Sequence, residues 1–248
     1  MNKRNLALLS LLFVLTAVSA AKDPFSFPVS TVILDAGHGG YDPGASASYS
    51  FTSGLVKESD LVLDITKRVH ALLTLERPDL TVVMTRLDDS FVSLADRSKI
   101  AYTAELAPQS SALFVSIHIN SATSGEATGF EVLTKRQAKR VVFLDEATPI
   151  GNITQFAPFS ALELNRLLNG RNLFVAKTFE EMLSQKMSAS RNRGIKERDL
   201  YVLNASRVPS VLLEVGFLSN EDEARSILSP AWRQQVAQAI AQAIRACV

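Results

Sequence analysis

Hydrophobic residues along the chain fall into two kinds of pattern. Continuous apolar runs, typical of buried strands, occupy residues 31–35, 80–85, 113–117 and 210–214. Between and after them, apolar residues recur every three or four positions, as on one face of a helix, over 61–72, 173–183 and 236–244. Because strands alternate with helices, the pattern predicts an α/β fold built on one sheet.

Polar residues and a proline mark where three helices should begin. Ser93 is followed three residues later by Asp96, and Asn220 is followed in the same way by Glu223. Such pairs are typical of helix N-termini. Pro230 stands where a proline is tolerated, in the first turn of the last helix.

Two segments have no clear period. Residues 21–30 contain two prolines and are expected to be a tether to a folded domain over residues 31–248. Residues 135–170 mix basic residues, two prolines and several hydrophobic residues. We expect this second segment to be an irregular insertion in the α/β pattern.

Composition limits the classes of protein that fit. Of the 248 residues, 47% are hydrophobic and 21% are charged, which is enough apolar material for the core of one globular domain. The formal net charge is +1 and no long basic run occurs, so we expect no nucleic-acid partner. Cys247 is the single cysteine, which excludes an internal disulfide.

The first 20 residues have the features of a secretory signal peptide. Lys3 and Arg4 precede an apolar run over 6–18, which ends in small residues around 17–20. The run is shorter than the about 20 apolar residues that span a bilayer, which favours cleavage over an uncleaved anchor. We therefore expect export to a periplasm, or otherwise to the cell wall or medium, with no stable membrane anchor after cleavage.

Three ionisable residues stand at the ends of predicted strands. His38 follows the first run in a glycine-rich turn, His118 follows the run 113–117, and Glu214 ends the run 210–214. In open α/β sheets ligands gather outside the carboxyl ends of the strands, so these side chains are expected to converge. Two neutral imidazoles suit zinc, and a hydrolytic zinc site takes three protein ligands and keeps one position for water.

Glu58 is the best candidate for the third ligand. It precedes Leu61 and Ile65 by three and seven residues, on the helix face that carries the apolar stripe. A carboxylate that faces the core is explained by a bound cation, and Glu214 is then free to act as a base. Other interpretations stay open here: satisfied structural histidines, a structural Glu214, or a phosphate site at the glycine-rich turn.

Four motifs occur in order along the chain. They read ILDAGHGG with DPG over 33–44, KE at 57–58, SIHINS over 116–121 and PSVLLEVGFLSN over 209–220. Further matches are Thr85-Arg86, Leu94 with Arg97, and RGIK over 193–196. Together they resemble the motifs of the zinc-dependent N-acetylmuramoyl-L-alanine amidases of the amidase_3 type, over nearly all of the chain from Thr31.

The resemblance implies a fold, a metal and a reaction. The fold is a mixed, mostly parallel central sheet flanked by helices in a single domain. His38, Glu58 and His118 bind one zinc ion per chain, and Glu214 is the catalytic acid/base. The substrate is peptidoglycan, cut between the lactyl group of N-acetylmuramic acid and L-alanine. Asn120 is either a residue that orients a ligand or binds substrate, or part of a strand-end turn.

The resemblance also raises a hypothesis about regulation. Residues 135–170 lie where some division-associated relatives carry a helix that covers the active site and is displaced by an activator protein. By this hypothesis the segment gates the site, and Glu146 or Glu163 reaches the zinc. The alternative is a surface loop with a helix over 161–168.

Two other functions fit part of the pattern. Another zinc-dependent cell-wall peptidase, such as a carboxypeptidase, would cut a peptide bond instead of the bond to the sugar. A non-catalytic murein-binding protein would keep the fold without turnover. Its usual signature is a missing ligand or a missing acid/base, and all four residues are present in this sequence.

Overall fold

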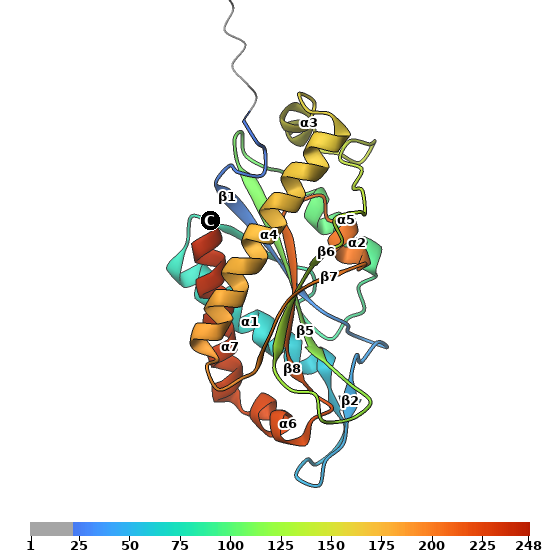
Figure 1. The fold of residues 1–248 in the computed structure, drawn as a ribbon, viewed down its shortest axis with the longest axis vertical. Coiled ribbons are helices and arrows are strands. Elements are labelled where there is room, and N and C mark those ends of the chain that lie inside the picture. The colour runs from blue at the N-terminus through green and yellow to red at the C-terminus, as the bar shows by residue number, and fades with distance from the viewer. Residues whose placement is uncertain (1–21) are drawn as a thin grey trace, which may run out of the picture.

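The computed structural model describes residues 22–248, and the signal peptide expected over residues 1–20 lies outside this range. Within it, a six-stranded sheet forms the centre of the molecule (Figure 1). The strands follow the spatial order β4 (Thr81–Met84), β1 (Val29–Ala36), β5 (Ser111–Asn120), β8 (Ser210–Phe217), β6 (Phe130–Lys135) and β7 (Asn192–Arg198). A separate two-stranded sheet pairs β2 (Ser46–Ala47) with β3 (Val56–Lys57).

The directions of the strands confirm a mixed, mostly parallel sheet. β4, β1, β5 and β8 run parallel to one another. β6 and β7 are parallel to each other, but β6 is antiparallel to β8. The carboxyl ends of β1, β5 and β8 therefore share one end of the sheet with the amino ends of β6 and β7.

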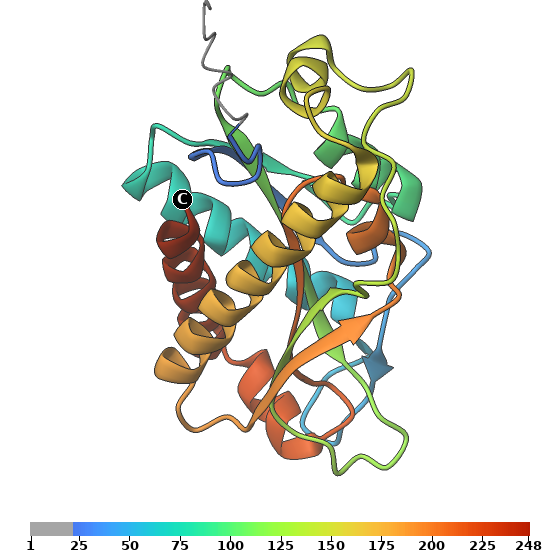
Figure 2. The ribbon, with the colours of Figure 1, turned by 45° about the horizontal axis from the view of Figure 1, so that its top comes forward.

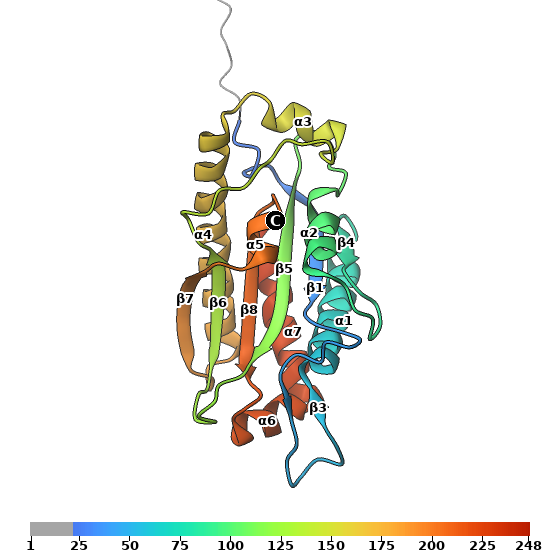
Figure 3. The ribbon, with the colours of Figure 1, turned by 90° about the vertical axis from the view of Figure 1, so that its right-hand side faces the viewer.

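Helices cover both faces of the sheet. On one face lie α1 (Glu58–Glu76), α7 (Pro230–Cys247) and α4 (Ala161–Lys186), side by side (Figures 1 and 2). On the other face lie the short helices α2 (Leu94–Tyr102) and α5 (Tyr201–Ala205) (Figure 3). α6 (Glu221–Leu228) leads into α7. No helix within residues 22–248 is both long enough and apolar enough to cross a bilayer.

The predicted helix starts are confirmed. Ser93 is the N-cap of α2 and accepts a hydrogen bond from the backbone of Asp96, and Asn220 caps α6 through Glu223 in the same way. Pro230 lies in the first turn of α7. These local signals are reliable because each satisfies backbone N–H groups, or avoids leaving one unsatisfied, at a helix start.

Side chains of the central strands alternate between two cores. In β5, Val115 and Ile117 pack into the larger core with α1 and α7, whereas Phe114 packs with α2 and α5 on the opposite face. By the same alternation His118 shares the face of Phe114, and Glu214 shares the face of Leu212. The polar residues of interest therefore lie on the face that carries the shorter helices.

The prediction that residues 21–30 form a tether is wrong. β1 begins at Val29, and Phe25 is only 2% exposed. The Phe25 ring packs against Phe143 and Phe156, with centroid separations of 5.6 and 5.7 Å. Prolines interrupt regular structure here, but burial of one aromatic side chain is worth about 1.5–3 kcal/mol and fixes the segment to the domain.

Residues 135–170 are also more regular than expected. They contain α3 (Ile150–Phe156), and α4 continues from Ala161 as one helix far beyond residue 168. The segment follows β6, whose carboxyl end lies at the amino ends of β1, β5 and β8 because β6 is antiparallel to β8. A third, small core joins it to the N-terminal residues through Phe25, Val141, Phe143, Phe156, Leu164 and Leu168.

Candidate metal and catalytic site

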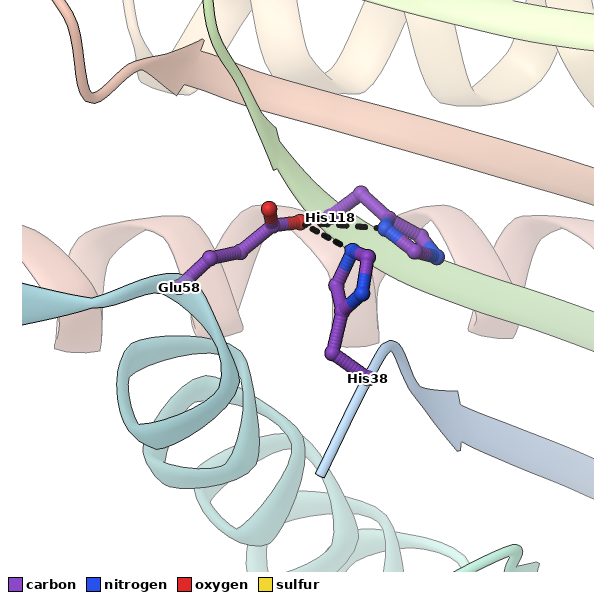
Figure 4. A group of neighbouring side chains, drawn as sticks. All are labelled: His38, Glu58 and His118. Atoms are coloured by element: carbon purple, nitrogen blue, oxygen red, sulfur yellow. Dashed lines mark hydrogen bonds and ion pairs between the residues drawn. The ribbon is translucent and has the colours of Figure 1, made fainter. Parts of the chain in front are cut away.

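Two histidines and a glutamate meet where β1 and β5 end (Figure 4). One ligand atom from each of His38, Glu58 and His118 lies within 4.8 Å of the other two. Glu58 Oε1 is 3.2 Å from His38 Nε2 and 3.0 Å from His118 Nδ1. The structure thus brings together the three side chains that the sequence singles out as candidate ligands.

His38 is held in place by its own loop and by α2. Its backbone is in the left-handed region, with φ of 59°. Its Nδ1 lies 2.8 Å from Asp42 Oδ2, so the carboxylate fixes the ring and directs Nε2 toward Glu58. Arg97 donates hydrogen bonds to the carbonyl oxygens of Ala36 and His38, which ties this turn to the helix.

The His118 ring lies directly against the backbone of Gly37. A Cβ atom at position 37 would be 2.2 Å from Cε1 of His118, closer than any side chain allows. Gly37 also donates its N–H to the carbonyl oxygen of Ile117, at 3.1 Å. The glycine-rich turn therefore lets the end of β1 approach the imidazole on β5, which brings the two histidines together.

Glu58 is buried at the first residue of α1 and is 4% exposed. Its Oε2 accepts a hydrogen bond from the N–H of Ala45 at 2.8 Å, and its Oε1 accepts one from the N–H of Ile119 at 3.0 Å. Leu61 and Ile65 are buried on the same helix, as the apolar stripe requires. Packing of that stripe turns Glu58 inward, as the sequence pattern predicts.

The three side chains shift one another's pKa values. Burial lowers the pKa of His38, but hydrogen bonds and charges of Glu58 and Asp42 outweigh it and raise this pKa to about 9. Burial also opposes protonation of His118, yet Glu58 raises its pKa. Burial raises the pKa of Glu58, but the two imidazoles outweigh it and hold that pKa far below its ordinary value. The two imidazoles therefore keep the Glu58 carboxylate negatively charged in spite of its burial.

Glu214 lies beside His118 on the neighbouring strand, directly in register with it. Burial has the largest effect on the pKa of Glu214 and raises it. The charge of His118 lowers this pKa, whereas the charges of Glu58 and Glu131 raise it. The resulting pKa is about 7. Its Oε2 is buried and has no hydrogen-bond partner among residues 22–248. A carboxyl group in this condition can accept and return a proton near neutral pH.

The donor set suits zinc. Zinc binds imidazole nitrogen and carboxylate oxygen at about 2.0–2.2 Å in a tetrahedron, which sets its ligand atoms about 3.4 Å apart. The separations of 3.0 and 3.2 Å around Glu58 Oε1 are close to this value. Three protein ligands leave a fourth position for water, and the buried oxygen of Glu214 without a partner in the described chain is consistent with a water there.

Asn120 contacts the carboxylate of Glu131 rather than one of the candidate metal ligands. Its Nδ2 donates to Glu131 Oε1 at 2.8 Å, and its Oδ1 accepts from the N–H of Ser121 at 2.8 Å. Glu131 is buried and also forms ion pairs with Arg193 and Lys196. The amide therefore orients Glu131 and stabilises the strand-end turn.

Several residues that support the site have no role predicted from the sequence, although Asp42, Arg86 and Arg97 stand in its motifs. The hydrophobic pattern does not identify the partners of two carboxylates: Asp42 contacts His38 across a turn, and Glu131 contacts Arg193 and Lys196 of β7. Arg86 and Arg97 are each 3% exposed and donate to backbone carbonyls of residues 36–38. The available signal was Arg86, which directly follows the predicted strand 80–85, because a buried guanidinium requires several acceptors.

The hypothesis that Glu146 or Glu163 reaches the zinc is wrong. Glu163 forms the capping box of α4 with Ser160, and Glu146 follows Asp145, which pairs with Arg207 ahead of β8. Leu164, next to Glu163, shares the small core with Phe25 ahead of β1, and Arg207 precedes the first residue of β8, so both acids lie near the amino ends of these parallel strands. The candidate ligands lie at the carboxyl ends, and the ten residues of β5 span about 30 Å. Residues 135–170 therefore do not cover the site.

Comparison with known proteins finds several amidases among the relatives of this chain. YqiI of Bacillus subtilis is 31% identical over 97% of this chain and 95% of its own length. The N-acetylmuramoyl-L-alanine amidase AmiC of Escherichia coli is 29% identical over 87% of this chain, which spans about half, 52%, of AmiC. The CwlD amidase of Clostridioides difficile, solved in complex with the GerS lipoprotein, matches with TM-score 0.66 and 27% identity, over 88% of this chain and 98% of CwlD.

The family assignment rests on the match over most of the domain. The family model described as N-acetylmuramoyl-L-alanine amidase matches residues 32–246, which contain all four candidate site residues and the whole sheet except the first three residues of β1. The chain therefore belongs to the N-acetylmuramoyl-L-alanine amidase family, a family of peptidoglycan hydrolases.

Proposed function

We propose that this protein is an exported amidase that hydrolyses the bond between the lactyl group of N-acetylmuramic acid and L-alanine in peptidoglycan. His38, Glu58 and His118 hold one zinc ion, and Glu214 is the catalytic acid/base. The observation that supports this most directly is the position of Glu214. It lies half-buried beside His118, and its buried oxygen Oε2 has no hydrogen-bond partner within residues 22–248.

Each residue of the site has a task in this reaction. Zinc, when bound, lowers the pKa of a coordinated water from about 15.7 toward about 7 and polarises the carbonyl group of the substrate. Glu214 takes the proton of the attacking water as the C–O bond forms. It then returns a proton to the alanine nitrogen as the C–N bond breaks, so no charge is left on the leaving amine.

Other residues keep this geometry fixed. The Asp42 carboxylate holds the proton of His38 on Nδ1, so that Nε2 faces the metal position. Backbone N–H groups of Ala45 and Ile119 hold both oxygens of Glu58. Fixed ligands reduce the reorganisation needed during the reaction, which is how preorganised sites lower barriers.

Location and partners follow from the substrate. Peptidoglycan lies outside the cytoplasmic membrane, and residues 1–20 have the composition of an export signal. We infer a periplasmic or cell-wall location. CwlD is bound to a lipoprotein, GerS. An activator of this chain stays a prediction, and it would act on the loops at the carboxyl ends of β1 and β5 rather than on residues 135–170.

Product analysis tests the proposal. Purified murein is digested with the zinc-loaded protein, and soluble products are separated by mass spectrometry. We expect intact stem peptides that begin with L-alanine, together with glycan chains that keep their lactyl groups. Shortened stem peptides would instead identify a carboxypeptidase, and murein binding without soluble products would identify a non-catalytic binder.

A further inference from the structure

Exposed apolar side chains gather beside the candidate metal site. A pocket of about 300 Å³ is bounded by His38 and His118 on one side and by residues of α2, α5 and the loops before them on the other. On its rim Phe91, Leu94 and Tyr201 are 41%, 56% and 52% exposed. Exposed large hydrophobic side chains grouped at a cleft are typical of a surface that binds a ligand or a partner.

Tyr41 extends this rim outward. It is 79% exposed and stacks on Phe91, with 4.2 Å between ring centroids and 26° between ring planes. Gly40 makes this contact possible, because its φ is +62° and a Cβ there would lie 2.8 Å from the backbone nitrogen of Phe91. The N–H of Gly40 also donates to Asp89 at 2.9 Å, which fastens the two loops together. The stacked pair is thus held in place by the backbone.

The side on which the leaving amine is protonated indicates which part of the substrate lies in this pocket. The pocket is bounded by the two histidines and by Leu212 of β8, but not by Glu214, which lies two residues further along β8 on the far side of His118 from β1. If Glu214 protonates the leaving amine, the stem peptide departs on the β8 side. The acyl half, which is the lactyl group with its sugar, then lies against β1, the pocket and the aromatic pair.

We propose, on the basis of the proposed function, that Tyr41 and Phe91 form a stacking surface for an N-acetylhexosamine ring of the glycan strand. A sugar ring presents an apolar face of C–H groups, and exposed aromatic rings bind such faces while their edges stay in water. A pocket of about 300 Å³ is at the small end of ligand sites and accommodates one ring rather than a multi-residue peptide. The pair therefore selects for the glycan and not for the stem peptide.

Two substrates separate this role from a structural one. One is a disaccharide peptide that contains N-acetylglucosamine and N-acetylmuramic acid, and the other is the same peptide carrying only a D-lactoyl group. We expect Tyr41→Ala and Phe91→Leu each to lower kcat/KM about tenfold on the disaccharide peptide. On the lactoyl peptide the change is expected to be less than about twofold. Phe174→Leu is the matched control, since Phe174 is 44% exposed on α4, far from the pocket.

A binding measurement gives a readout that needs no turnover. A peptide-free tetrasaccharide of the glycan strand is titrated into each variant by calorimetry, and both aromatic variants are expected to bind it about tenfold more weakly than the wild type and Phe174→Leu. Equal losses of kcat/KM on both substrates, or unchanged affinity for the tetrasaccharide, would overturn the proposal. If neither substrate is cleaved by the wild type, the proposed function fails, while the tetrasaccharide titration still decides the stacking surface.

Discussion

Glu131 on β6 and Glu214 on β8 lie directly opposite each other in the antiparallel pair of strands. Opposite residues on adjacent strands point to the same face and lie about 5 Å apart at Cβ. Glu131 is neutralised by Arg193 and Lys196, whereas one oxygen of Glu214 has no partner within residues 22–248. One carboxylate of the pair is therefore structural, and the other is available for proton transfer.

This pairing predicts how Glu131→Gln changes the pH profile. The negative charge of Glu131 raises the pKa of Glu214, so its removal lowers that pKa. Because Glu214 must be ionised to take a proton, the acid limb of kcat/KM is expected to move to lower pH. A pH series on dye-labelled murein measures the shift. Glu181→Gln, an exposed change on α4, is the control, and a limb that stays in place in both variants contradicts the prediction.

Loss of the acid/base should remove turnover without removing the metal. Glu214→Gln keeps the size of the side chain but abolishes proton exchange, so we expect kcat to fall by about 10²–10⁴-fold. Metal analysis of the same sample is expected to give about one zinc per chain, as for the wild type. A variant that loses its zinc would show that Glu214 is a ligand.

Metal binding should depend on pH through His38. The pKa of His38 is raised from 6.5 to about 9, so its protonation stabilises the metal-free fold fully below about pH 6.5. This contribution is lost as the pH rises through about 9. Zinc needs the neutral ring, so its affinity should increase over the same range and binding near pH 7.5 should release protons. Calorimetry in two buffers of different ionisation enthalpy measures the release, and identical apparent enthalpies would refute it.

The carboxylate behind His38 should tune zinc affinity. Asp42→Asn removes the charge that fixes the ring through Nδ1, and changes to such partners lower metal affinity by about 10–100-fold. Competition with a fluorescent chelator measures the loss. Asp79→Asn, at an exposed ion pair with Arg77, serves as the matched control. Equal affinities in the two variants would mean that Asp42 does not orient the ring.

Residues 135–170 should act in stability rather than in gating. Phe156 is 6% exposed in the small core with Phe25, and Phe156→Ala is expected to lower the free energy of unfolding by about 3–5 kcal/mol. Chemical denaturation measures this change. Because the segment lies at the far end of the sheet, kcat/KM at low temperature should stay unchanged. An increase in kcat/KM would restore the gating hypothesis.

The candidate site was largely predictable because each of its residues is next to a strong local signal. His38, His118 and Glu214 follow or end buried strands, and Glu58 shares the apolar face of α1. The carboxyl ends of parallel strands lie at one edge of the sheet. The positions of these residues at strand ends were therefore enough to predict that their side chains meet. The roles of Asp42 and Glu131 were not predicted, because these roles depend on partners that hydrophobic periodicity does not identify.

Strand β7 and the position of residues 135–170 were less predictable than the site. β7 has the polar sequence NRGIKER at the edge of the sheet, so it shows no apolar run. Without β7 and the direction of β6, the position of residues 135–170 could not be deduced. Because β6 is antiparallel to β8, the segment that follows β6 starts at the opposite end of the sheet, and Glu146 and Glu163 therefore lie away from the candidate ligands.

The packing of Phe25 against Phe143 and Phe156 has a practical consequence for immobilisation. It anchors the chain near residue 25 ahead of β1, and the full length of this strand separates it from the pocket beside His38. A tag or solid support attached ahead of Lys22 would therefore leave that pocket turned outward. Bead-bound protein should reach insoluble murein as readily as the same protein linked through a surface residue beside α3.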